Sequence, residues 1–378
     1  MKKRVLVLSI AASSVFAVKA QTSNDVLSLL TQKNIITQTE ADSLRADASI
    51  KQQETDAKKK SSPVVAIKGL QIGGFTQVRY QAQQQAGKQD GFDIRRARLD
   101  LKSTVSPYWG YKLQFELAGA PKLLDAYAEL KLNDYLNFTI GQFKVPYSQE
   151  GLASTPKLEI IDASLVVDAL TARKTDANGD QQGFDIGVQA GGSFLKINNL
   201  ALVEYKLGIF NGSGINVAEN HQKKDFAGRL VFHPIKGIVF GGFIYNGYGY
   251  YNNNSSKTSV VDEHIRNRYG AELNVEFKGA SLKAEYIKGK DGNILRDGYY
   301  ISAGYYILSQ KLQVLVKLDN YDPNNASSKK NDKLNYYTGI VNYNFNSTTR
   351  IQFGYTIKKE EAKEIKNNLA VVQFQIGF

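Results

Sequence analysis

Polar and apolar residues alternate through most of the chain after residue 69, most clearly in the segment 92–105. One set of alternate positions there is apolar or small, and the other is charged: Ala97, Leu99, Leu101, Ser103 and Val105 against Arg96, Arg98, Asp100 and Lys102. Successive side chains of a strand point to opposite faces, so this period of two predicts a β-strand with one apolar and one basic face. Such a strand suits a soluble sheet, or a membrane barrel with a wet interior and a lipid-facing exterior.

About sixteen segments of this kind follow one another, an even number in the size range of water-filled bacterial barrels. Tight connections, such as Lys278-Gly279, alternate with longer polar ones, such as 80–91, 246–265 and 322–333. Segment 143–182 breaks the rhythm, and a loop this long is uncommon unless it has a function. In a barrel it has the length to fold inward and narrow the lumen.

Two features favour the barrel over a soluble sandwich. Nearly every apolar strand face is free of charge, and many of these faces carry Tyr, Phe or Trp near the strand ends, as in the aromatic girdles of membrane barrels. The chain also shows no clean break after residue 70, whereas sandwiches would divide roughly 300 residues into separate domains. We therefore predict an all-β protein, a transmembrane antiparallel β-barrel of about 16 strands with a short N-terminal helical segment.

The N-terminus has the pattern of an export signal. A basic start (Lys2, Lys3, Arg4) precedes an apolar run and the small outer residues of Val18-Lys19-Ala20. The run is short and contains serines, which favours a cleaved signal over a membrane anchor. Residues 24–57 are predicted to be helical, with a second helix starting at Thr39, and 51–62 read as a polar linker. The predicted domains are a signal peptide (1–20), a helical segment with linker (21–62) and an outer-membrane barrel (63–378).

Composition excludes several classes of function. The chain has no Cys, so disulfides, thiol nucleophiles and Cys-based zinc sites are absent. His221, His233 and His264 show no metal-ligand spacing and no partner in a recognised catalytic motif. The formal net charge is +12, but the aromatic and basic platforms of nucleic-acid modules are not recognisable. We expect no catalytic residue, no metal, no cofactor and no nucleic-acid partner.

Basic residues on the polar strand faces are the candidate functional groups. The residues predicted to line the pore and bind anions are Arg79, Arg96, Arg98, Lys102, Lys112, Lys131 and Lys144. Positive charge in a narrow lumen lowers the barrier for anions, and the planar donor fork of Arg suits phosphate. The alternative is a structural network of charged side chains, in which Arg96, Arg98, Asp100 and Lys102 pair with Glu116, Asp125, Glu129 and Lys131 on neighbouring strands. In the second half, Glu272, Glu276 and Glu285 are also predicted to point inward.

Three segments resemble the phosphate-selective porin O/P family. They are FDIRRARLDLKSTVSPYWGYKLQFELAGAPKLLDAYAELKLNDYLNFTIGQFKVPYSQE (92–150), LEIIDASLVVDAL (158–170) and YKLGIFNGSGIN (205–216). The resemblance implies a trimeric, sixteen-stranded outer-membrane porin with an inward-folded third loop and an anion-preferring pore. Arg95, Arg96, Arg98, Lys102 and Lys144 fall in matching motifs. Arg95 has the parity of the apolar face, so it belongs either to the headgroup region or to a bulge.

The predicted function is an outer-membrane porin, a water-filled, anion-preferring channel for phosphate or other small anions in a Gram-negative cell. The alternative is a non-conducting barrel that serves as a binding or assembly module; a barrel hydrolase lacks a recognisable nucleophile pair. The expected partners are small anions, outer-membrane lipid and two further copies of the chain in a homotrimer. The aromatic end at Phe378 resembles the signal read by outer-membrane assembly machinery, and the N-terminal segment is expected in the periplasm.

Overall fold

A computed structural model describes residues 23–33, 35–42, 44, 47, 69–171, 183–219, 223–252, 261–325 and 332–378. The chain divides into two compact units, Met1–Ile67 and Lys68–Phe378. The predicted export signal (1–20) and the linker (51–62) lie outside the described residues. They remain predictions.

The first unit contains α1 (Ser23–Gln32) and a second helical segment that includes residues 38–42. A capping box starts the second segment: the Thr37 backbone N donates to Glu40 Oε2 at 2.8 Å, and the Glu40 N donates to Thr37 Oγ1 at 3.3 Å. The Thr37 backbone N and Thr37 Oγ1 both donate to the Glu40 carboxylate, and these two hydrogen bonds hold the pKa of Glu40 below its usual value. The cap lies two residues before the predicted start at Thr39. None of the helices in the described residues is long and apolar enough to cross a membrane.

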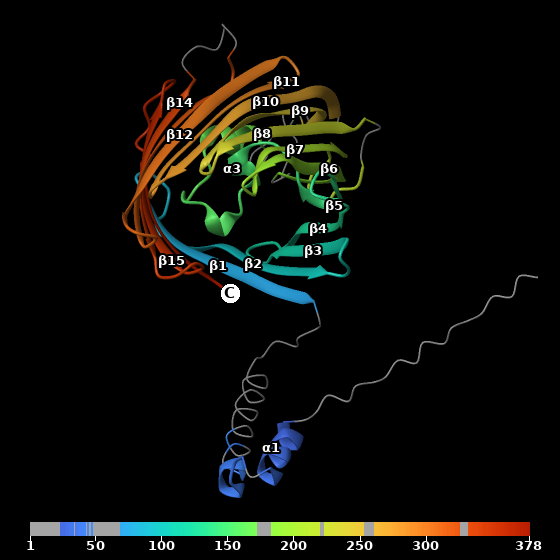
Figure 1. The fold of residues 1–378 in the computed structure, drawn as a ribbon. Coiled ribbons are helices and arrows are strands. Elements are labelled where there is room, and N and C mark those ends of the chain that lie inside the picture. Colours follow the sequence, from blue (N-terminus) through green and yellow to red (C-terminus); the bar gives the residue numbers. More distant parts are fainter. Residues whose placement is uncertain are drawn as a thin grey trace, which may run out of the picture. The chain divides into compact units, whose positions relative to one another are not determined.

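Sixteen antiparallel strands form one closed barrel in the second unit, as the alternation predicts (Figure 1). Each strand pairs with its neighbours in sequence, and the first strand pairs with the last. The strands are β1 (Leu70–Gln83), β2 (Gly91–Thr104), β3 (Trp109–Glu116), β4 (Lys122–Lys131), β5 (Asn137–Lys144), β6 (Phe184–Ile197), β7 (Leu200–Phe210), β8 (Asp225–Ile235), β9 (Ile238–Asn252), β10 (Val261–Phe277), β11 (Ala280–Asp291), β12 (Ile294–Leu308), β13 (Leu312–Asp322), β14 (Leu334–Asn344), β15 (Arg350–Glu360) and β16 (Leu369–Gly377).

The two faces of the wall differ as a membrane barrel requires. On β13, for example, Val316 is 66% exposed on the outside, whereas its neighbour Lys317 is only 6% exposed on the inside. Large apolar side chains are exposed on the outer face all along the barrel, where lipid would cover them. The loop predicted at 246–265 is shorter than expected, because β9 and β10 continue into it from both sides.

Two β-bulges change which residues face the lumen. Gln77 pairs with Arg96 and Val78 pairs with Ile94, which leaves Arg95 as the extra residue of β2. A bulge lets two consecutive side chains point to one face, so Arg95 faces inward beside Arg96. This resolves the two placements left open for Arg95 in favour of the bulge. On β4, Leu124 is the extra residue, and the resulting change of parity turns Lys122 inward.

The long interruption of the alternation folds into the barrel, as its length suggests. The inward loop (residues 145–171) contains α3 (Gln149–Leu152), the 3-10 helix η1 (Thr155–Lys157) and α4 (Leu165–Leu170). In Figure 1 it is the green segment inside the ring of strands. A buried apolar cluster joins it to the inner wall; the members are Phe143, Val145, Tyr147, Val166, Val167, Leu170, Phe210, Ala227, Phe243, Tyr245, Ile287, Tyr300 and Tyr321.

Candidate functional site

The inward loop rests on the inner wall formed by β10–β13. Helix α4 packs against β11, β12 and β13, and Val166, Val167 and Leu170 are fully buried there. Backbone groups of α4 also bond to the wall. The Leu165 N donates to Asp319 Oδ1 at 3.2 Å, and the Leu170 carbonyl accepts from Arg268 Nε at 3.1 Å. The loop is therefore fixed on this side by both apolar and polar contacts.

Three cations of this wall are buried. Arg266 and Arg268 on β10 are 0% and 1% exposed, and Lys317 on β13 is similarly enclosed. Arg268 pairs with Asp291 at 2.8 Å, and Lys317 pairs with Asp319 at 3.0 Å. The alternation did not identify Arg266 and Arg268 as inward residues, because they directly follow the loop predicted at 246–265. Arg266 and Arg268 have the same spacing as Arg96 and Arg98, and this spacing was the sequence signal that could have identified them as inward residues.

Tyr147, near the start of the inward loop, packs against aromatic rings of the inner wall. Its ring lies 5.1 Å from the ring of Tyr245 and 6.1 Å from that of Phe243. Burial raises the pKa of the Tyr147 phenol, so the side chain stays neutral at physiological pH. A neutral phenol suits this apolar contact, and it adds no negative charge to the lumen.

The opposite side of the inward loop borders an open, positively charged space. This basic cavity, of about 340 Å³, lies between the loop and the wall of β2–β6. Five cationic residues line it, against two carboxylates. The full lining is Arg95, Arg96, Arg98, Glu116, Ala118, Ala120, Lys122, Lys144, Thr155, Ala163, Asp168 and Phe184.

Hydrogen bonds connect the basic cavity to the loop. Arg98 forms an ion pair with Glu116 at 2.8 Å, and its NH1 donates to Thr155 Oγ1 at 3.2 Å. Lys144 Nζ donates to the carbonyl oxygens of Gly151 and Ala153, at 3.0 and 2.8 Å. The cations are thus held by the wall and the loop together, which limits their movement within the cavity.

A second cavity, of about 280 Å³, adjoins the basic cavity and shares Arg95, Ala163 and Asp168 with it. Arg95 pairs there with Asp162 of the loop at 2.8 Å. Arg79 pairs with Asp93 at 2.7 Å and with Asp162 at 3.4 Å. Arg79 is therefore held in a cluster of carboxylates, next to the basic cavity and outside its lining.

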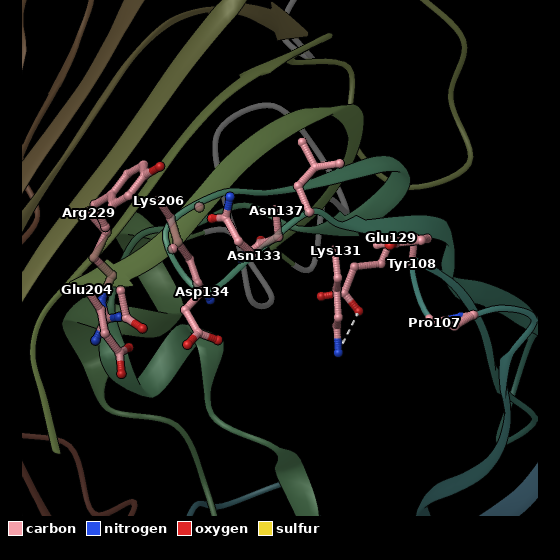
Figure 2. A pocket seen from close by; sticks show the side chains of 15 residues that line it. Pro107, Tyr108, Glu129, Lys131, Asn133, Asp134, Asn137, Glu204, Lys206 and Arg229 are labelled. Carbon is pink, nitrogen blue, oxygen red and sulfur yellow. Dashed lines mark ion pairs between the residues drawn. The ribbon is translucent and has the colours of Figure 1, made fainter. Parts of the chain in front are cut away.

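A third cavity, the rim cavity, lies where the tight turns join the strands, and it measures about 580 Å³. Figure 2 shows Lys131 beside Glu129, with Glu204, Lys206 and Arg229 farther along the lining. The Lys131–Glu129 distance is 3.6 Å, and Arg229 pairs with Glu272. Cations and carboxylates alternate in this lining, so the rim cavity carries little excess charge.

The structure separates the predicted site residues into groups. Arg96, Arg98 and Lys144 meet in the basic cavity, whereas Lys131 lines the rim cavity. Lys112 pairs with Asp125 at 2.5 Å, and it lies opposite Lys102 in the register of β2 and β3. The Arg98–Glu116 pair belongs to the structural network considered as the alternative, whereas Asp125 of that network pairs with Lys112.

Lys122 was missed as a cavity residue. Strict alternation assigns it to the apolar face of β4, and only the bulge at Leu124 turns it inward. In the described ranges, no three His, Asp or Glu side chains are grouped to hold a metal ion. His233 lies 3.5 Å from Glu204 on the inner wall.

Comparison with known proteins gives one family and one distant relative. Residues 67–241 match the model of the family described as phosphate-selective porin O and P. An uncharacterized protein of Aquifex aeolicus (strain VF5) is 28% identical over an alignment of 298 positions, with a coverage of 68% for each of the two chains. The matched range covers β1–β8 and the inward loop, so it includes the whole basic cavity.

Solved structures with a similar fold include an anion-selective porin and an outer-membrane protein. An anion-selective porin from Comamonas acidovorans has a TM-score of 0.61 at 14% identity, and OmpT of Vibrio cholerae in its trimer form has 0.58 at 11%. Each comparison covers 82% of this chain and 99% of the other. The matching family is described as porins, which are channels, and this agrees with the expectation that the chain is no enzyme. The resemblance to the phosphate-selective porin O and P family is thus confirmed over residues 67–241, and the barrel has the fold of an outer-membrane porin.

Proposed function

We propose that this outer-membrane porin is a water-filled, anion-preferring diffusion channel for phosphate or other small anions. The observation that carries the proposal is the basic cavity, in which five cationic residues face two carboxylates between the wall and the inward loop. A solute that passes the loop on its open side meets this surface. The rim cavity, where charges of both signs alternate, offers no comparable preference.

The physical basis is the weak screening of charge in a narrow lumen with low-dielectric walls. Arg95, Arg96 and Arg98 bring three guanidinium groups to one wall within four residues of sequence. A guanidinium binds the oxygens of an oxyanion through parallel N–H donors, which favours phosphate over a spherical ion of the same charge. The ion pairs of Arg95 and Arg98 reduce the excess of positive charge without removing it.

The reversal potential of the refolded protein in a planar bilayer under a KCl gradient tests the proposal. An anion-signed potential supports it, and block of the chloride current by added phosphate supports an oxyanion site. Lys122→Gln removes one cavity cation and is expected to weaken both effects. Lys363→Gln is the matched control, because Lys363 is exposed in the loop between β15 and β16.

Other results would lead to other functions. A cation-signed potential would refute the anion preference and leave a general porin. No conductance at all would favour the alternative of a plugged barrel that binds or assembles other molecules.

The proposal extends to assembly and location. We infer a homotrimer, delivered by an export signal at residues 1–20 and inserted by machinery that recognises the Phe378 end. The helical segment 24–57 would then lie in the periplasm. Support for the trimer comes from the family resemblance and from the similar fold of OmpT of Vibrio cholerae, described in a trimer form.

A further inference from the structure

A row of neutral amides crosses the inner wall beside the inward loop. We call it the amide belt. Its six members lie on β1 and β13–β16 and are at most 2% exposed: Gln77, Gln313, Asn342, Gln352, Gln373 and Gln375. Burying an amide side chain costs free energy unless it is hydrogen-bonded, so the hydrogen-bond partners of these six residues show what the amide belt holds in place.

Two of these amides connect the basic cavity to the inward loop. Arg96 NH1 donates to Gln77 Oε1 at 2.9 Å, and Gln77 Nε2 donates to Gln375 Oε1 at 2.8 Å. Gln375 Nε2 in turn donates to the carbonyl oxygen of Pro156 in η1 at 3.2 Å. We call Gln77 and Gln375 the amide relay, since they join a cavity arginine to the loop that faces it.

The chemistry of the two ends fixes the direction of the amide relay. A guanidinium has donors only, so Gln77 must present its oxygen to Arg96 and its amide nitrogen to Gln375. A carbonyl oxygen accepts only, so Gln375 must present its nitrogen to Pro156. Arg350 NH2 reinforces this orientation, because it donates to the same Gln375 oxygen at 3.2 Å. No flipped arrangement of either amide satisfies all the partners.

We propose that Gln77 and Gln375 are positioning residues of the basic cavity, which hold the Arg96 guanidinium at a fixed place relative to the inward loop and so help to determine anion selectivity. The inference rests on the proposed function. A neutral amide is suited to this role, because it fixes an arginine without cancelling its charge. A carboxylate at position 77 would hold Arg96 equally well, but it would neutralise the arginine.

The rest of the amide belt provides a matched control. Gln373 Nε2 donates to Gln352 Oε1 at 2.9 Å, and Gln352 Nε2 donates to Asn342 Oδ1 at 2.9 Å. Gln313 Nε2 ends this branch on Glu159 Oε1 of the loop at 2.7 Å. Gln373 is as buried as Gln77 and lies two residues from Gln375 on β16, but its side chain bonds to Gln352 and not to Arg96.

The test compares Gln77→Leu, Gln77→Glu and Gln373→Leu in the full-length protein. Folding is checked by heat-modifiable mobility on gels, and selectivity by the reversal potential and by phosphate block of the chloride current. Gln77→Leu is expected to weaken phosphate block about threefold, with Gln373→Leu close to wild type. Gln77→Glu is expected to lower the chloride-to-potassium permeability ratio about fivefold, because it adds a negative charge beside Arg96.

The possible outcomes separate the two proposals. An anion-selective wild type with equal effects of Gln77→Leu and Gln373→Leu overturns the positioning role and leaves the proposed function intact. A wild type without anion preference overturns both. If Gln77→Leu does not fold, Gln77→Asn serves in its place, since the shorter amide cannot reach Arg96 and Gln375 together. Wild-type selectivity in folded Gln77→Asn would also overturn the positioning role.

Discussion

Two stretches of the inner wall carry the same sequence feature with opposite results. Arg96 and Arg98 on β2 and Arg266 and Arg268 on β10 are pairs of inward arginines at alternate positions. The β2 pair lines an open cavity, whereas the β10 pair is buried against the inward loop, where Arg266 contacts Tyr147 and Arg268 donates to the Leu170 carbonyl. A cation on the inner face of a strand is therefore not always accessible to solutes in the lumen. That depends on which part of the wall the inward loop covers.

We expect loss of the covered arginines to affect stability more than selectivity. Arg268 and Asp291 are both fully enclosed, so their charges cancel where no solute reaches. Removing one partner of such a pair leaves a buried charge without compensation, which is strongly destabilising. On the open wall, water in the cavity can solvate a carboxylate that loses its partner. The four predictions below test this contrast.

The largest effect is expected from removing the cover itself. Val167 of α4 is fully buried against the wall, and Val167→Asp would bury a carboxylate without a partner, at a cost of several kcal/mol. We expect α4 to leave the wall, so that single-channel conductance rises and larger neutral sugars enter in liposome-swelling assays. Val167→Ala is the milder control, since it keeps the contact apolar. Unchanged conductance in a folded Val167→Asp barrel would show that α4 does not limit the lumen.

A smaller but still large effect is expected at the buried ion pair. Arg268→Ala should lower the free energy of unfolding by about 3 kcal/mol, the low end for a broken buried pair, because Arg296 still lies 3.4 Å from Asp291. Urea titration of the barrel in lipid bilayers measures this loss. Arg98→Ala on the open wall should reduce stability less and weaken anion preference more. Equal stability losses in the two variants would remove the distinction between the walls.

Deletion of Arg95 tests the bulge with little disturbance of the strand. The register already pairs Gln77 with Arg96 and Val78 with Ile94, so the deletion restores regular pairing without moving any other side chain to the opposite face. A unit charge at about 4 Å contributes roughly 1 kcal/mol in water, so the anion-to-cation permeability ratio should fall about fivefold. Arg95→Lys, which keeps the charge, is the control. An unchanged ratio in the deletion variant would show that Arg95 does not act on the permeating ions.

The smallest effect is expected at the rim cavity. Lys131 is well exposed, and its contact with Glu129 is 3.6 Å. Exposed pairs of this kind contribute less than about 1 kcal/mol, so Lys131→Gln should leave stability nearly unchanged. We expect the permeability ratio to stay within about twofold of wild type, since carboxylates balance the cations there. A larger drop would move the selective region from the basic cavity toward the rim.

The strands and the inward loop were predictable because their signals are local. Side-chain alternation depends only on neighbouring residues, as in 92–105, and the length of the segment between β5 and β6 is visible in the sequence. The bulges were less predictable: a bulge was one of the two placements open for Arg95, and the sequence carried no sign of the bulge at Leu124. An extra residue at Arg95 or Leu124 changes the parity of one strand end without changing composition, and pairing partners far along the chain determine where it lies.

The covering of Arg266 and Arg268 was also beyond sequence reasoning. It results from contacts between α4 and strands roughly a hundred residues or more later in the chain. The amide belt could not be predicted either, because its hydrogen bonds also depend on the closed barrel. Gln352 and Gln373 each read as an ordinary polar position of an alternating strand, and only the closed barrel brings them together.

The hydrogen bond between Gln77 and Gln375 crosses the pairing of β1 with β16, which is where the two ends of the barrel meet. A barrel growing strand by strand can form every other hairpin before this seam closes. Arg96 would then reach its final position only in the last step of assembly, after β16 has docked on β1. An incompletely closed barrel would lack the finished cavity, and its ion selectivity would report how far assembly has progressed.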